Sequence, residues 1–90
     1  MKRLGELGGE LAERLDLPEE ALLGAARLTV TSGRRALIEN HHGLLEYGAE
    51  QITVSTGRGR IILRGGGLVL SAMNQRELLI CGRISSVEWE

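Results

Sequence analysis

The sequence predicts a mainly β protein: a small, curled, antiparallel roll or sandwich of about seven or eight short strands, preceded by a short amphipathic helix. From Leu28 onward, short apolar runs begin about every eight residues, separated by Gly, Ser, Asn, Arg and His. The runs are LTVT, ALIE, LLEY, ITVS, IILR, LVLS, LLIC and ISSVEW. Several alternate apolar and polar residues, which is typical of a strand with one buried and one wet face. Ile52 and Val54 are expected to face the core with Thr53 facing water, and Trp89 is also expected on the buried face. Because this spacing also suits stacked rungs, a short β-solenoid is the alternative topology.

The first element, in residues 1–24, is predicted to be helical. Four leucines recur at helical spacing and form one apolar stripe: Leu4, Leu7, Leu11 and Leu15. Asp16 and Glu19 follow the pattern of a capping box, so a second short helical turn is expected before Gly24. The domain boundary is placed there, which leaves residues 25–90 as the β domain.

The strands of the β domain are expected to build a core almost free of aromatic rings. The chain has no Phe, one Trp and one Tyr, so Leu, Ile, Val and Ala must supply the buried surface. Nearly all glycines from Gly33 onward fall between the apolar runs or at their ends, where they are expected to form turns and points of strong curvature. A chain of 90 residues supports one such core.

Two adjacent histidines, His41 and His42, lie in the stretch that most invites a chemical interpretation. Residues 40–43 stand between two apolar runs, and their composition predicts a hairpin connection. Neighbouring side chains point in different directions there, so the two imidazoles are not expected to hold one metal ion. An acid/base pair with Glu39 lacks a nucleophile or substrate anchor. The sequence therefore predicts no enzyme, metal or cofactor, and Tyr47 is expected to be a packed ring.

A glycine-rich stretch, residues 57–67, carries three arginines. It lacks the Lys-Ser/Thr ending of a phosphate-binding Walker loop and does not lead into a helix, so its glycines are predicted to be turn residues. Arg58, Arg60 and Arg64, together with Arg34, form a candidate interaction surface for an acidic protein or for lipid headgroups.

The charge balance argues against nucleic acid as a partner. Eleven basic and twelve acidic residues give a formal net charge of -1, and the chain lacks aromatic platforms for bases. No stretch reaches the roughly 18 apolar residues of a membrane span, and the first residues lack the long apolar run and small-residue cleavage site of a signal peptide. A single cysteine suits a reducing compartment. The protein is therefore expected to be cytoplasmic.

The pattern of the β domain also resembles a known family. It contains an IENH.G.LEY box, then an I.V.T..G...I.G..L.L rhythm, and a closing EL.I.G.ISSVE. The motif residues, which are mostly structural in kind, are Glu39, Asn40, His41, Gly43, Tyr47, Gly59, Gly65, Gly82 and Ser85. With its lead-in, the stretch 17–90 resembles the YabP/YqfC family of sporulation proteins from Firmicutes, and the YqfC type more closely. Ala25 and Ala26 stand where such chains tend to have a second proline.

The resemblance implies a role in endospore formation in the mother cell. The gene of a YqfC-type protein is typically a neighbour of the gene for YqfD, a larger membrane-bound sporulation protein. The family thus implies a non-catalytic interaction or scaffold module that associates with the membrane through a YqfD-like partner. Pairing between copies of the chain, which would give a homo-oligomer, is a further expectation. An exposed sheet edge can pair with a strand of a partner protein or with a second copy of the chain. The alternative is a small ligand-binding or hydrolytic domain with His41 and His42 on the wall of one pocket.

Overall fold

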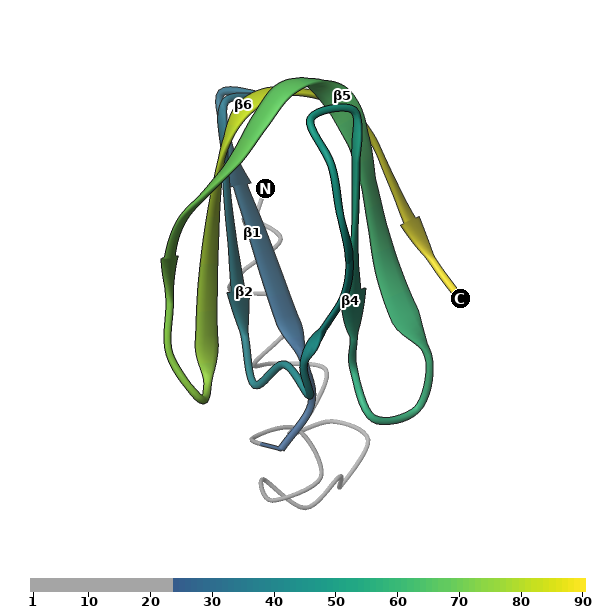
Figure 1. The fold of residues 1–90 in the computed structure, drawn as a ribbon. Coiled ribbons are helices and arrows are strands. Elements are labelled where there is room, and N and C mark those ends of the chain that lie inside the picture. The colour runs from purple at the N-terminus through teal and green to yellow at the C-terminus, as the bar shows by residue number, and fades with distance from the viewer. Residues whose placement is uncertain (1–23) are drawn as a thin grey trace, which may run out of the picture.

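A computed structural model describes residues 24–90 as one antiparallel sheet. Its strands are β1 (Arg27–Thr31), β2 (Arg35–Glu39), β3 (Leu44–Tyr47), β4 (Gln51–Ser55), β5 (Arg60–Met73) and β6 (Glu77–Trp89). They lie in the order β1-β2-β6-β5-β4-β3 (Figure 1). All neighbouring strands are antiparallel, which confirms the predicted fold class and excludes the solenoid, whose stacked rungs are parallel. The predicted N-terminal helix lies outside the described residues, so the domain boundary stays a prediction.

Eight apolar runs form only six strands in residues 24–90, because two pairs of runs are continuous. β5 has 14 residues and β6 has 13, and each contains glycines that resemble turn residues in the sequence. The pairing of β5 with β6 shifts register between Arg64 and Gly65 and again between Gly66 and Val69. These shifts are bulges, which bend a strand without ending it. Figure 1 shows both strands arching over the top of the molecule at this place.

The bend depends on close backbone approaches that only glycine permits. Gly65 passes directly against the carbonyl group of Arg83, where a Cβ atom would overlap it. Gly82 has a φ of +133°, and a Cβ atom there would lie 2.6 Å from the carbonyl oxygen of Gly67. The bends of the two strands therefore nest in each other, which fixes the corner of the sheet.

The bend brings the two halves of the sheet together around one aliphatic core. One half contains β1, β2 and the ends of β5 and β6 that meet at their hairpin; the other contains β3, β4 and the opposite ends of β5 and β6. Residues from both halves belong to a single buried cluster: Ala36, Ile38, Ile52, Val54, Ile61, Leu63, Leu68, Leu78 and Ile80. The predicted aliphatic core is thereby confirmed.

The alternation of buried and wet residues holds best in the inner strands. In β2, Ala36 and Ile38 are fully buried between more exposed neighbours. Thr53, predicted to face water, is buried; its partners in register are Glu46 of β3 and Ile62 of β5. Trp89, predicted to face the core, is 55% exposed, because β2 accompanies β6 only as far as Cys81 and leaves the outer side of its last residues unpaired.

Candidate functional site

Residues 40–43 connect the two halves of the sheet, and the hairpin predicted for them is wrong. β2 pairs with β1 and β6, whereas β3 pairs with β4, so the chain crosses from one half to the other here. The prediction failed because a crossing and a hairpin need the same turn residues. Asn40 has a φ of +60° and Gly43 a φ of +125°, in the left-handed region that Asn and Gly adopt most readily.

His41 fastens this crossing to the β5–β6 hairpin. The residue is only 7% exposed; its Nε2 atom lies 2.9 Å from the carbonyl oxygen of Asn74, and its Nδ1 atom accepts the backbone N–H of Gly43 at 3.0 Å. Because Nδ1 accepts, the proton is assigned to Nε2, which donates to Asn74. The Asn74 side chain in turn accepts the N–H groups of Arg76 and Glu77 and closes the hairpin. Both ring nitrogens of His41 are therefore engaged in structural hydrogen bonds.

His42 points to a different surface from His41. It is exposed and lies against Gly57, where a Cβ atom would come within 3.0 Å of the imidazole Nε2. The pocket that His42 lines does not include His41, so the two imidazoles do not share a pocket wall. Glu39 lies in register between Arg27 and Glu77. Within residues 24–90, no group of three or more His, Cys, Asp or Glu side chains is arranged to hold a metal ion.

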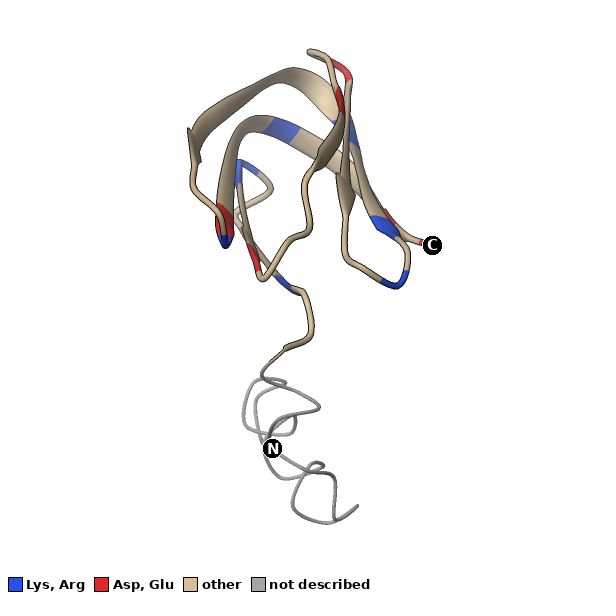
Figure 2. Ribbon diagram, turned by 60° about the horizontal axis from the view of Figure 1, so that its bottom comes forward, with Lys and Arg blue, Asp and Glu red and all other residues tan. Residues whose placement is uncertain are grey.

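The four candidate arginines are not gathered in one patch. Arg60 pairs with Glu90, with 2.6 Å between Nε and Oε1. Arg64 pairs with Glu88 of β6, with 3.0 Å between Nη1 and Oε2. Arg58 lies in the β4–β5 turn, whereas Arg34 lies in the β1–β2 turn beside the bend of β6. Figure 2 shows basic and acidic segments dispersed over the sheet. The positive charge of the two arginines on β5 is therefore largely balanced locally.

The glycines and the serine of the family-like pattern shape the sheet. Gly59 passes directly against the carbonyl group of Glu90, which allows the end of β6 to pair with the start of β5. Gly65 and Gly82 form the nested bend, and Ser85 is the extra residue of a bulge in β6. The pattern therefore records turns and close approaches of the backbone.

The exposed apolar side chains gather at unpaired edges of the sheet, which the sequence did not reveal. The large hydrophobic residues that are most exposed in the described part of the chain are Val30, Leu45, Tyr47, Val69, Met73 and Trp89. Val30 lies on the edge strand β1, and Leu45 and Tyr47 lie on the edge strand β3. The others lie where β5 and β6 have lost one neighbour, since β4 accompanies β5 only to Arg64 and β2 accompanies β6 only to Cys81.

Tyr47 connects two of these edges. Its ring, predicted to be packed, is 54% exposed, and its Oη atom accepts the backbone N–H of Leu70 at 3.1 Å. The hydrogen bond between His41 and Asn74 joins the crossing that precedes β3 to the residue that follows β5. We call the surface formed by β3 and residues 69–73 of β5 the β3–β5 seam. It carries Leu45, Tyr47, Val69 and Met73.

Comparison with known proteins identifies the family. The model of the YabP family matches residues 23–90, which include every strand of the sheet. The chain belongs to the YabP family. It is also 26% identical over 88 residues to the uncharacterized protein YqfC of Bacillus subtilis (strain 168), in an alignment that covers 98% of this chain and 95% of that protein. These matches confirm the resemblance. No solved structure matches the chain. Residues 24–90 include no helix long and apolar enough to cross a membrane.

Proposed function

We propose that this YabP-family chain is a non-catalytic interaction module that binds a membrane-bound sporulation protein through the β3–β5 seam. The family resemblance supports a YqfD-like partner in the mother cell. The observation that carries the proposal is the position of the exposed hydrophobic side chains, because most of those on the described surface lie along this seam. Exposed apolar side chains that gather at one place on a soluble domain commonly mark an interaction surface.

The edge strand β3 has the properties of a pairing site. An unpaired edge offers backbone N–H and C=O groups to a strand from another chain. β3 has the sequence LLEY, without the Lys, Arg or Pro that commonly protects an edge, and Leu45 is 59% exposed. A bulge between Leu44 and Glu46 distorts the edge, which disfavours pairing with arbitrary strands and favours a partner of matching shape.

The second edge strand is the less suitable surface. β1 begins with Arg27, and its exposed large hydrophobic residue, Val30, is 40% exposed. A basic residue on an edge limits association. The two edges of one sheet therefore provide a binding surface and a matched control.

Co-purification from membranes of sporulating cells tests the proposal. The tagged chain is recovered in cells with and without the YqfD-like neighbour, as wild type, as a Leu45→Glu, Val69→Glu double variant and as a Val30→Glu control. Each substituted side chain is at least 40% exposed, so the core stays intact. We expect neighbour-dependent membrane recovery of the wild type and the control, and loss of recovery of the double variant. Recovery of every form in the soluble fraction alone, whether or not the neighbour is present, contradicts the proposal.

Self-association through the same seam is the second outcome to measure. It would give dimers of the purified chain without the neighbour, and the double variant would abolish them. Sedimentation at several protein concentrations separates this outcome from binding to the membrane protein, because only self-association depends on the concentration of the chain alone.

A further inference from the structure

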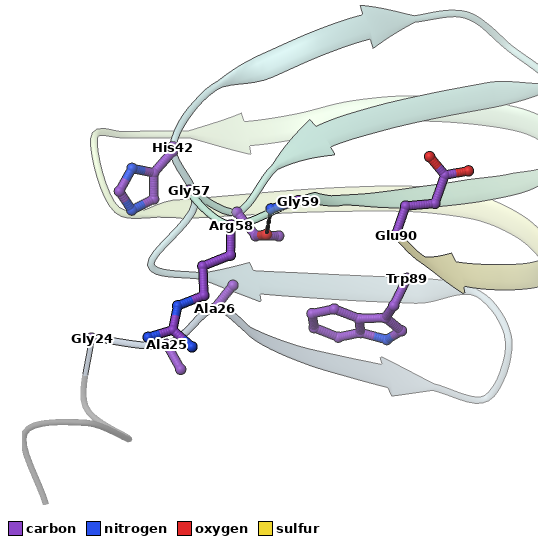
Figure 3. A pocket seen from close by; sticks show the side chains of 10 residues that line it. Gly24, Ala25, Ala26, His42, Gly57, Arg58, Gly59, Trp89 and Glu90 are labelled. Atoms are coloured by element: carbon purple, nitrogen blue, oxygen red, sulfur yellow. Dashed lines mark hydrogen bonds between the residues drawn. The ribbon is translucent and has the colours of Figure 1, made fainter.

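A pocket of about 610 Å³ opens where β1 begins and β6 ends. Its walls are the segment before β1, the β4–β5 turn, His42 and the last residues of β6 (Figure 3). The two alanines before β1 and the two glycines of the turn make much of the lining apolar. Figure 3 shows the Arg58 side chain extending toward Ala25, and the indole ring of Trp89 on the opposite side of the pocket. Trp89 is the largest apolar group of the pocket, and 55% of it is exposed.

The wall of this pocket is also where residues 1–23 join the sheet. Gly24 lines the pocket, and the next residue is held in place by Asn40, whose Nδ2 atom donates to the carbonyl oxygen of Ala25 at 3.1 Å. Leu22 and Leu23 directly precede Gly24 in the chain. A backbone spans at most about 3.5 Å per residue, so the chain before Gly24 starts at the pocket wall and is short enough here for a docked segment to begin within two residues of it.

The sequence before Gly24 complements the chemistry of the pocket. Residues 17–23 have the sequence LPEEALL, which combines three leucines with an acidic pair. The leucines match the apolar lining, and transfer of Trp89 out of water is favourable. The carboxylates of Glu19 and Glu20 carry the charge opposite to that of Arg58 on the wall.

We propose that residues 17–23 of the same chain occupy this pocket, with Leu22 and Leu23 against Trp89. The alignment with the Bacillus subtilis protein covers 98% of the chain and thus includes this segment. The pocket and the β3–β5 seam share no residues, so the inference does not depend on the proposed partner.

Fluorescence of Trp89 in the full chain tests the proposal, because Trp89 is its single tryptophan. The wild type is compared with a Leu22→Asp, Leu23→Asp variant and with a Leu4→Asp, Leu7→Asp control, which adds the same charges outside the docking segment. In the Leu22/Leu23 variant we expect emission at longer wavelength and loss of protection from acrylamide. We expect the control to match the wild type. Circular dichroism verifies that all forms keep the sheet.

Two results overturn the proposal. The first is equal quenching of the wild type and both variants. The second is protection of the wild type that disappears on dilution, which would assign the pocket to a second copy of the chain.

A charge exchange gives a second readout, which applies even if the leucine variant does not fold. A Glu19→Arg, Glu20→Arg variant should lose part of the protection of Trp89. Adding Arg58→Glu to it should restore that protection. Quenching that is unchanged by the first exchange, or not restored by the second, contradicts the assigned contact between the acidic pair and Arg58.

Discussion

Replacing His41 by alanine removes the side chain that ties the crossing between the sheet halves to the β5–β6 hairpin. The residue is 7% exposed and makes hydrogen bonds to two backbone groups, the N–H of Gly43 and the carbonyl of Asn74. A buried polar group left without its partner costs about 1–3 kcal/mol. Loss of both bonds and of the packed ring should lower the free energy of unfolding by about 3 kcal/mol, a large share of the roughly 5–15 kcal/mol that stabilises a domain.

Thermal unfolding measures this loss. For a domain of this size, about 3 kcal/mol corresponds to a fall in Tm of roughly 12–24 °C. His41→Asn keeps an acceptor near Gly43 and His41→Gln keeps a donor for Asn74, so each should recover part of the loss. His42→Ala, at the exposed neighbouring residue, is the control and should change stability by less than about 0.5 kcal/mol. If His41→Ala and His42→Ala lower the Tm equally, the role assigned to the buried imidazole is wrong.

Two further substitutions test the bend and the arginines. Gly82→Ala should lower the free energy of unfolding in urea by about 3 kcal/mol or more, because a Cβ atom there would meet the carbonyl oxygen of Gly67 at 2.6 Å. Gly67→Ala should lower it by only about 1 kcal/mol, because a Cβ atom on Gly67 meets nothing within 4 Å. Equal costs would contradict the nested bend. Arg64→Ala should change stability by less than about 1 kcal/mol, because its ion pair with Glu88 is about half exposed. The same variant should leave membrane recovery unchanged, and loss of recovery would return the arginines to the partner surface.

The fold class and the core could be predicted because they depend on local pattern. The alternation around Ile52 and Val54 places both in the core whatever the order of the strands. The number of strands could not be predicted, because the glycines at 65–67 and Gly82 have the composition of turns. A glycine ends a strand or bends it according to whether the neighbouring strand continues past it, and that neighbour is distant in the sequence.

The site was only partly predictable for the same reason. Divergent directions for His41 and His42 follow from their adjacency, but the burial of His41 depends on Asn74, which lies 33 residues away. The cluster of arginines in the sequence suggested a basic surface. The glutamate that pairs with Arg60 directly follows β6 and the one that pairs with Arg64 lies in β6, 30 and 24 residues further along. Exposure of apolar residues at the edges depends on where each pair of strands separates, which only the assembled sheet defines.

Backbone amide hydrogen exchange of the chain, alone and in complex with the YqfD-like protein, shows whether the β3–β5 seam binds the partner. We expect slower exchange on binding in residues 44–47 and 69–73, the two sides of the β3–β5 seam, and unchanged exchange in β1. Slower exchange confined to β1, or a complex that forms without any change along the seam, would contradict the claim that this edge binds the partner.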